Sequence, residues 1–515
     1  MVPVRAARVT TEKLGHLPGA RGTHNTRLVS HECRVVVYNP RFSQSWLEKS
    51  LSGRIYDSPR FFYALAALLL IAGALSQLRI SIPTRPIGSV DEIAALKDRE
   101  DLNVIFVLID TLRADRLGSY GYERDTTPLI DELGRSGIRF AETHAQSSWT
   151  KTSMASLWTG LFPPRTGVLR YDDAVPPKAT MPAEIFREAG YATAGIFRNG
   201  WVGANFGFNQ GFETYVKPQK REVKEGFEKH VPGAATVPGT DSEVTLAALE
   251  FVRNNAHQKF LLYLHYMDAH QYAYEAEFAQ LDYGSTISDS YDRAIRWTDA
   301  NIDQLVAELE DLDLMKKTIL VIASDHGEAF REHGIEGHAQ DLHIEALRVP
   351  LIINLPFRID GGLTVEPVTR NVDIWPTILD MVGLPPLPST DGISLIPMIQ
   401  AAAEGSSTEE LESFAFLDLG WGQRNSDFQP LAALQHEGRK VMVELAEPEE
   451  TLMAFDVDAD PGERKNLKGG RPDWIEPLQA KMAEHSEAET AIGSLQIELD
   501  EMYRAQLEAL GYVVK

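Results

Sequence analysis

Continuous apolar runs alternate with amphipathic segments through the middle of the chain. Short runs without polar interruption are typical of strands buried on both faces of a parallel sheet. They cover residues 103–109, 192–197, 260–265, 318–323 and 349–354. Between them, segments such as 241–255 and 289–310 have the periodicity of helices that bury one face. The pattern predicts an α/β fold with a doubly wound, mostly parallel sheet sandwiched by helices.

Polar residues follow several of these runs directly. Asp110 ends the first run, Asn199 follows the second, His270 the third, and Asp325 with His326 the fourth. Open α/β sheets bind ligands beyond the carboxyl ends of their strands. We therefore expect these side chains to share one site.

The pattern changes after about residue 400. Residues 401–411 are polar and predict an exposed connection, and residues 412–457 contain short strand-like pieces. An apolar stripe predicts a last helix over about 488–510. These observations divide the body into a catalytic domain over 102–400 and a small antiparallel subdomain with a terminal helix over 401–515.

Residues 61–78 form an uncharged apolar run close to the minimum length of a membrane span. The first 60 residues carry ten Lys and Arg against four Asp and Glu, and 79–101 is a polar segment that we interpret as a linker. The basic leader predicts a partly disordered cytoplasmic N-terminus, a single-pass anchor in the cell membrane and an extracytoplasmic catalytic domain. A buried core helix and a cleaved signal near Ala72 are the alternatives.

Composition narrows the function classes. The 515-residue chain is 43% hydrophobic and 24% charged, with a net charge of −24. These values are normal for a globular protein with a large core, and the acidic body argues against nucleic acid as a partner. The only cysteine, Cys33, lies in the leader, so no disulfide is expected in the body.

Two carboxylates, an imidazole and a hydroxyl suggest a metal centre. Asp325 and His326 follow a buried run, as Asp110 does, and Thr150 precedes a helix-like segment. Such oxygen and nitrogen donors suit a divalent cation. At a helix N-cap, Thr150 would also lie where the helix dipole favours negative charge.

The segment from Thr150 to Gly160 resembles the nucleophile segment of the sulfatase family, in the alkaline phosphatase superfamily. The usual pattern there is Cys-x-Pro-Ser-Arg, and the Cys is oxidised to formylglycine. Here Thr150 occupies the Cys position, Thr152 the Pro position and Met154 the Arg position. The resemblance implies a sulfatase-like enzyme without formylglycine, with Thr150 as its nucleophile.

The same resemblance implies a ligand set for one divalent ion, Mn²⁺, Zn²⁺ or Ca²⁺. Asp110 matches the first metal-binding Asp of the superfamily, and Thr150 would be a ligand as well as the nucleophile. Asp325 and His326 match the Asp-His pair of phosphonate monoester hydrolases and lipoteichoic acid synthases. Many sulfatases have a second Asp where this chain has Thr111. Imidazole in place of an oxygen ligand shifts the preference from Ca²⁺ towards Mn²⁺ or Zn²⁺.

Four further residues receive roles beside this set. His270 and His338 are expected to contact a non-bridging oxygen or to protonate the leaving group, as catalytic residues. Lys151 and Asn199 are expected to bind substrate. His265, like His333, is expected to support the fold only.

The resemblance covers residues 102–515 and leaves the substrate open. We expect a two-step displacement on a phosphate or sulfate ester, glycan- or lipid-linked, with phosphate at least as suitable because Thr150 lacks the second hydroxyl of a formylglycine gem-diol. One alternative is a phospholipid head-group transferase, moving phosphoethanolamine or phosphoglycerol. Another is a catalytically silent binding module. The oligomeric state stays open.

Overall fold

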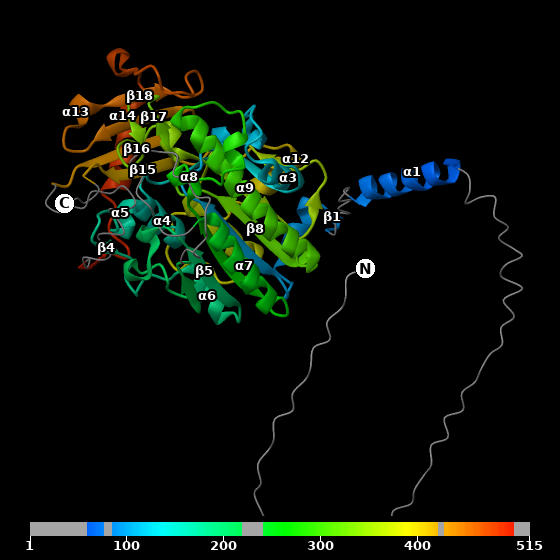
Figure 1. The fold of residues 1–515 in the computed structure, drawn as a ribbon. Helices are drawn as coiled ribbons and strands as arrows, with labels where there is room; N and C mark the ends of the chain where they lie inside the picture. Colours follow the sequence, from blue (N-terminus) through cyan, green and yellow to red (C-terminus); the bar gives the residue numbers. More distant parts are fainter. Residues whose placement is uncertain (1–58, 77–84, 219–239, 421–426, 499–515) are drawn as a thin grey trace, which may run out of the picture. The chain divides into compact units, whose positions relative to one another are not determined.

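The computed structural model describes residues 59–76, 85–218, 240–420 and 427–498 (Figure 1). The chain divides into two units, Met1–Ser81 and Ile82–Lys515. The described part of the first unit is the helix α1 (Pro59–Ser76). Within the described ranges, no helix combines the length and the apolar character that a membrane span requires. Residues 1–58 of the predicted leader lie outside the described residues.

A nine-stranded sheet forms the centre of the second unit, and all five apolar runs are strands in it. Eight strands follow one another in the order β13-β3-β11-β8-β2-β7-β5-β6, and β14 pairs with β3. The pairs of β11 with β3 and β8 are antiparallel, and the other pairs are parallel. The strands are β2 (Asn103–Ile109), β3 (Ile138–His144), β5 (Ala192–Phe197), β6 (Thr214–Val216), β7 (Phe260–Tyr266), β8 (Thr318–Ala323), β11 (Arg348–Asn354), β13 (Leu363–Val365) and β14 (Thr369–Arg370).

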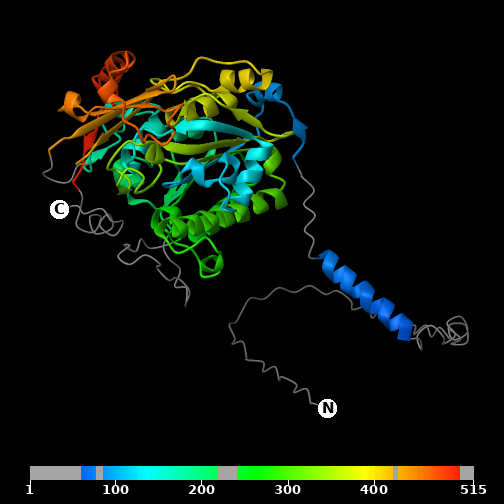
Figure 2. The ribbon, with the colours of Figure 1, turned by 90° about the horizontal axis from the view of Figure 1, so that it is seen from above.

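Helices cover both faces of this sheet (Figures 1 and 2). Alternate residues of β2 point to opposite faces, so each face of the strand joins a different core. Val104 and Phe106 belong to the core with α4 (Thr150–Thr159), α6 (Pro182–Glu188) and α11 (Ile374–Met381). Ile105 and Val107 belong to the core with α3 (Pro128–Ser136), α7 (Asp241–Asn255) and α9 (Ile287–Asp311). The predicted three-layer α/β architecture is confirmed.

The parallel register brings several strand ends to one edge of the sheet. Leu108 of β2 pairs with His265 of β7 and with Ala323 of β8. His265 also pairs with Phe197 of β5. The residues that follow β2, β5 and β8 therefore emerge side by side, as the sequence predicts.

A four-stranded antiparallel sheet forms the C-terminal subdomain, with α14 (Ile475–Ser486) packed against it. Its strands are β15 (Ser413–Asp418), β16 (Pro430–His436), β17 (Arg439–Glu444) and β18 (Met453–Asp456). The helix predicted over 488–510 is wrong for 488–498, and the rest lies outside the described residues. The short strand β19 (Leu495–Gln496) pairs there with β4 (Asp173–Ala174). The apolar residues Leu495 and Ile497 are two apart, which is the period of a strand.

The prediction of a linker over 79–101 is also wrong for its second half, which contains regular structure. β1 (Ile87–Gly88) pairs with β12 (Arg358–Ile359). The helix α2 (Ile93–Leu96) buries both of its terminal side chains in the core. Apolar residues three apart give this polar segment a face that packs on the body.

Candidate active site

Thr150 is the first residue of α4, and its side chain is fully buried. Trp149, with extended backbone angles, occupies the N-cap position predicted for Thr150, so the hydroxyl lies one residue further into the helix. Oγ1 of Thr150 lies 3.1 Å from Nε2 of His326 and 3.4 Å from Nδ2 of Asn199. The positive end of the helix dipole favours negative charge on this oxygen.

Hydroxyl groups of α4 fix the helix against its surroundings. Ser153 Oγ donates to the carbonyl oxygen of Asp325 at 2.6 Å, and Thr152 Oγ1 donates to that of Val168 at 3.1 Å. The first bond joins the start of α4 to the end of β8. The start of α4 and the segment that holds Asp325 and His326 are therefore fixed to each other.

Asp110, His265 and Asp325 form a buried group whose ligand atoms all lie within 4.8 Å of one another. Oδ1 of Asp110 and Oδ2 of Asp325 are buried and have no hydrogen-bond partner. Buried carboxylate oxygens normally have a hydrogen-bond partner, so two without one on neighbouring carboxylates indicate room for a cation. The residues present fit a divalent metal ion.

His265, which was expected only to support the fold, is therefore a residue of the candidate metal site. Its Nε2 lies 2.9 Å from Oδ2 of Asp110, and its Nδ1 lies 2.7 Å from the hydroxyl of Tyr263. A signal for it was present, because His265 is a polar residue near the carboxyl end of an otherwise apolar buried strand. The predicted ligand His326 is not in this group, although its Nε2 lies 3.4 Å from Oδ2 of Asp325.

The two carboxylates have opposite electrostatic settings. Burial alone would raise the pKa of Asp110, but the imidazoles of His270 and His265 outweigh it and lower the pKa. Burial and the charge of Asp110 raise the pKa of Asp325. Two carboxylates that lie close together repel each other when both are ionised, and a cation between them offsets this repulsion.

Thr111, at the position of the second sulfatase Asp, has a left-handed backbone with φ of 61°. This conformation is rare for a β-branched residue and costs conformational energy. It lets the Thr111 amide donate to Oδ1 of Asp325 at 3.3 Å, while the hydroxyl of Tyr291 donates to the Thr111 carbonyl at 2.6 Å. The turn after β2 is thus held against the end of β8 at a strained residue.

Asn199 lies where the sequence predicts it. Its Nδ2 donates to Oδ2 of Asp110 at 2.6 Å and reaches Oγ1 of Thr150. Its Oδ1 accepts a hydrogen bond from the Trp201 amide at 2.9 Å, which fixes the orientation of the side-chain amide. Nδ2 therefore faces the reacting groups.

His270 and His338 are also brought to the site. The His338 ring lies 4.6 Å from that of His326 and 4.9 Å from that of His270, between ring centroids. Glu328, which the sequence pattern did not indicate, is buried and lies 3.2 Å from Nδ1 of His338.

The two histidines differ in their ease of protonation. Burial lowers the pKa of His338, but Glu328 outweighs burial and the pKa is raised. Burial lowers the pKa of His270 to about 4, so its imidazole is neutral at pH 7. His338 suits proton donation and His270 suits hydrogen bonding without a change in charge.

Lys151 does not face the site, contrary to the predicted substrate contact. Its side chain is fully buried, and Nζ donates to the carbonyl oxygens of Tyr171 and Asp173 at 2.5 and 2.9 Å. The same nitrogen lies 4.3 Å from the centroid of the Phe206 ring and 5.0 Å from that of Trp201. A fully buried side chain held in this cage anchors α4 and is not exposed to a substrate.

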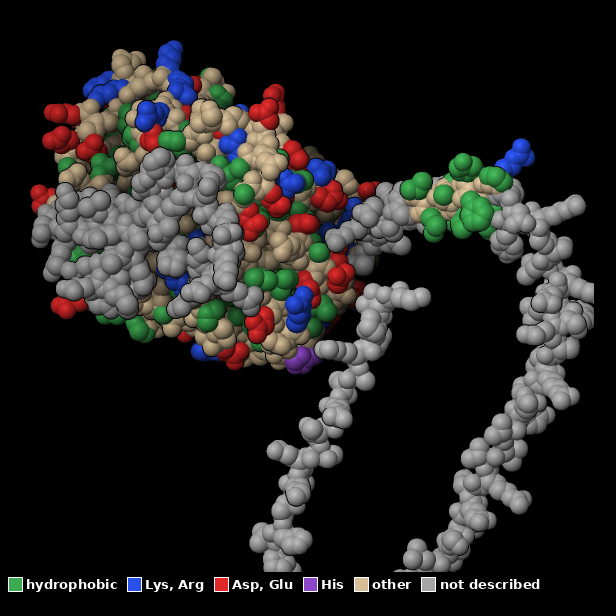
Figure 3. Space-filling model, viewed as in Figure 1, with side chains coloured by type: hydrophobic (Ala, Val, Ile, Leu, Met, Phe, Trp, Pro, Cys, Tyr) green, Lys and Arg blue, Asp and Glu red, His purple; other side chains and the backbone are tan. Residues whose placement is uncertain are grey.

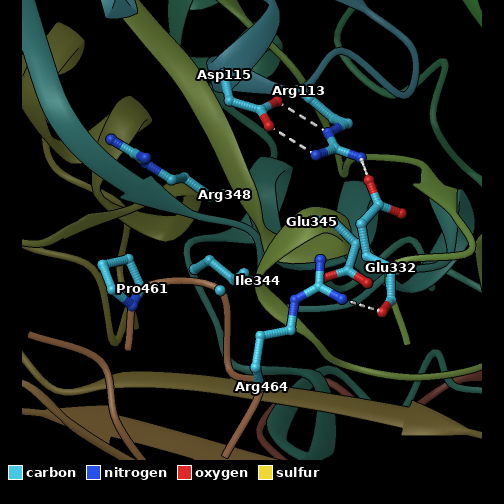
Figure 4. A pocket seen from close by; sticks show the side chains of 9 residues that line it. Arg113, Asp115, Glu332, Ile344, Glu345, Arg348, Pro461 and Arg464 are labelled. Carbon is cyan, nitrogen blue, oxygen red and sulfur yellow. Dashed lines mark hydrogen bonds and ion pairs between the residues drawn. The ribbon is translucent and has the colours of Figure 1, made fainter. Parts of the chain in front are cut away.

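A separate cavity of about 210 Å³ lies between the two parts of the body (Figure 4). Asp115 and Glu332 both bind the Arg113 guanidinium in it, and Arg464 donates to the Glu332 carbonyl. Two further charged groups of its lining, Arg348 and Glu345, pair with Glu142 and His333 outside it, and no predicted site residue lines the cavity. On the face drawn in Figure 3, acidic and basic side chains are interspersed.

Comparisons with known proteins agree with this geometry. The family model "Sulfatase" matches residues 102–384, and the model "N-sulphoglucosamine sulphohydrolase, C-terminal" matches residues 332–490. Arylsulfatase K of Gallus gallus is 25% identical over 59% of this chain and 67% of its own. Steryl-sulfatase of Mus musculus is 22% identical over 71% of this chain and 78% of its own.

Solved structures share the fold. A 2-O GAG sulfatase superposes with a TM-score of 0.60 and 18% identity, over 75% of this chain and 91% of its own. The phosphonate monoester hydrolase of Agrobacterium radiobacter gives 0.58 and 19%, over 77% of this chain and the whole of its own. From its matched family model and its fold, the chain belongs to the sulfatase family of the alkaline phosphatase superfamily, whose members are ester hydrolases.

Proposed function

We propose that this protein is a metal-dependent hydrolase of sulfate esters in which Thr150 is the nucleophile in place of formylglycine. One observation carries the proposal: the Thr150 hydroxyl is buried at a helix N-terminus, within hydrogen-bond reach of His326 and Asn199. A capping or packing role alone would not require an imidazole acceptor on this oxygen.

Asp110, His265 and Asp325 would hold the metal ion, and their two unpartnered carboxylate oxygens support this assignment. A divalent ion bound there supplies positive charge that stabilises the anionic ester and lowers the pKa of a nearby hydroxyl. Mn²⁺ or Zn²⁺ suits a set that contains imidazole, and Ca²⁺ suits the carboxylates.

His326 would accept the Thr150 proton. Its Nδ1 lies 2.9 Å from the carbonyl oxygen of Gly327, and only a protonated Nδ1 makes a hydrogen bond there. Nε2 then carries the lone pair that faces Oγ1 of Thr150. Loss of the hydroxyl proton to Nε2 leaves an alkoxide that can attack sulfur.

In the first step, Oγ1 of Thr150 forms a bond to sulfur and the ester oxygen leaves with its electron pair. His338, held by Glu328, donates a proton to that oxygen. Asn199 keeps its bond to Asp110 and would redirect its second N–H from Thr150 to a sulfuryl oxygen. In the second step, water attacks sulfur and gives a proton to His338, the bond between sulfur and Oγ1 of Thr150 breaks, and His326 returns its proton to Oγ1 as sulfate leaves. Thr150 has no second hydroxyl to expel sulfate, so this step depends on the water.

Sulfate esters are proposed first because the family and the relatives named above are sulfatases. A glycan- or lipid-linked ester fits the proposal, and phosphate esters are the second candidate. A head-group transferase would use the same first step, with an acceptor alcohol in place of water. The two unpartnered carboxylate oxygens argue against a silent binding module, which has no use for them.

The proposal is tested with the purified full-length chain and an ester panel: aryl sulfate, aryl phosphate, phosphodiester and phosphonate monoester, with added Mn²⁺, Zn²⁺ or Ca²⁺. We expect turnover of the sulfate ester that stops with a chelator and returns with metal. Turnover only when a lipid donor and an acceptor alcohol are both present would identify a transferase. Protein that binds no divalent metal and turns over no ester would contradict the proposal.

Anchoring by residues 61–78 and an extracytoplasmic catalytic domain belong to the same proposal. They rest on the uncharged run and the basic leader of the sequence. Fractionation of cells that express the full chain, followed by carbonate washing, is the test. Recovery of the intact chain in the soluble fraction would contradict the anchor.

A further inference from the structure

A fully buried guanidinium lies directly beside the site. Nη1 of Arg198 donates to Oδ1 of Asp241 at 3.0 Å and to Oδ1 of Asp268, and Nη2 donates to Oε1 of Gln271 at 3.0 Å. None of the three charged side chains is exposed by more than 1%. We call Arg198, Asp241 and Asp268 the buried arginine cluster.

The carboxylates of this cluster bind backbone and side-chain donors from three helices. Oδ2 of Asp268 accepts from Nε1 of Trp297 and from the Asp241 amide, both at 2.8 Å. Asp241 accepts from the Met267 amide at 2.7 Å and from the Thr298 hydroxyl at 2.6 Å. The cluster therefore fixes α7, α9 and the short helix α8 (Asp268–Gln271) relative to the end of β5.

Stability alone is a weak reason for such a cluster. Taking one guanidinium and two carboxylates out of water costs free energy that their mutual attraction repays only in part. Burial and the neighbouring Asp268 raise the pKa of Asp241 to about 7, which reflects this cost. In some proteins, buried ionic groups define one geometry rather than add stability.

The residues that the cluster fixes are the substrate-side groups of the site. Arg198 immediately precedes Asn199, and Asp268 lies two residues before His270 in α8. We propose that the buried arginine cluster is a positioning device that holds Asn199 and His270 at the reacting ester. The inference rests on the proposed function for its kinetic test.

Asp268→Asn tests the inference, with Asp292→Asn as its matched control. Asp292 is equally buried, lies on α9, and pairs with Arg116 and Arg124. Both variants should lower the melting temperature. We expect only Asp268→Asn to lower kcat, by about 10- to 100-fold with a smaller change in KM, because misplaced catalytic groups cost rate more than binding. An equal kcat in the two variants would overturn the proposal.

A double-mutant cycle separates positioning from general weakening. If Asp268 acts through His270, then adding Asp268→Asn to His270→Ala should lower kcat much less than it does in the wild type. Additive losses would overturn the proposal. If Asp268→Asn does not fold, Trp297→Phe removes one donor to Asp268 and enters the same cycle.

The ¹H–¹³C NMR signal of the His270 ring, assigned with His270→Gln, gives a readout that needs no turnover. The signal should move in Asp268→Asn and stay in place in Asp292→Asn. An unmoved signal in Asp268→Asn would overturn positioning even in an enzyme that is active. A wild type that turns over no ester but shows the shift would contradict the proposed function and leave positioning supported.

Discussion

At the residue scale, the chemistry of Thr150 depends on its neighbours. A free hydroxyl is a poor nucleophile. Here it faces an imidazole lone pair of His326 and lies at the positive end of α4. In the proposed mechanism, threonine in place of the family's cysteine keeps an attacking oxygen and lacks the second hydroxyl that would release sulfate.

Asn199→Ala should lower kcat by about 10²-fold, the usual cost of removing a donor to the developing charge. The side chain donates to Asp110 and reaches Thr150. Steady-state kinetics on the preferred ester measure the effect. Asn354→Ala is the control, because Asn354 is equally buried but lies away from the site. Its backbone is in register with Leu320 of β8, whereas Asp325 follows the carboxyl end of that strand. Equal kcat values in the two variants would contradict a catalytic role for Asn199.

His265→Gln should weaken binding of Mn²⁺ or Zn²⁺ by at least about 10-fold, since the loss of one imidazole from a metal centre costs that much or more. Isothermal titration and metal analysis of the purified protein measure this. His326→Gln should lower kcat with a smaller loss of metal. If His326→Gln lost more metal than His265→Gln, His326 would be the ligand and His265 would not.

At the element scale, α4 ends at Gly160, a position that disfavours any larger residue. Gly160 has φ of +69°, and a Cβ there would lie 2.4 Å from Oγ1 of Thr390. Gly160→Ala should lower the free energy of unfolding by about 1–3 kcal/mol through backbone strain, and by more through the contact. Gly190→Ala is the control, since its φ is +82° and a Cβ there would meet open space. Denaturant unfolding of both gives the difference, and equal losses would contradict the contact.

Strands and long helices were predictable because buried strands leave continuous apolar runs. The ends of β2, β5 and β8 also predicted Asp110, Asn199 and Asp325 correctly as neighbours. His265 was missed because it lies within a strand, where a polar residue is usually structural. The direction of Lys151 could not be predicted, because the carbonyl oxygens of its cage come from residues about 20 positions away.

At the scale of the whole molecule, the buried carboxylate of Glu463 in the C-terminal subdomain contacts His343 of the catalytic domain. Oε1 of Glu463 accepts from Nζ of Lys440 at 2.7 Å, and its Oε2 lies 2.9 Å from Nδ1 of His343. Burial opposes ionisation of Glu463, but Lys440 and His343 lower its pKa to about 2 from 4.5. A lowered pKa stabilises the fold fully above pH 4.5, and this contribution is lost as the pH falls towards 2.

Glu463→Gln should lower the free energy of unfolding at pH 7 by about 3–5 kcal/mol, because it leaves Lys440 buried without its partner. The difference from wild type should shrink as the pH falls below 4.5. Chemical denaturation across this range measures it. Glu308→Gln, which breaks an exposed pair with Arg253, should have a much smaller effect at every pH. A pH-independent loss would contradict the role of the Glu463 charge.

The central claim is that the Thr150 hydroxyl attacks the ester, and kcat/KM of Thr150→Ala with added metal tests it most directly. Thr152→Ala is the matched control, since Thr152 is buried on the same helix and bonds only the Val168 carbonyl. We predict that Thr150→Ala loses about 10³-fold or more in kcat/KM, as removal of a covalent nucleophile does, while Thr152→Ala stays close to wild type. A Thr150→Ala enzyme as active as Thr152→Ala would contradict the account.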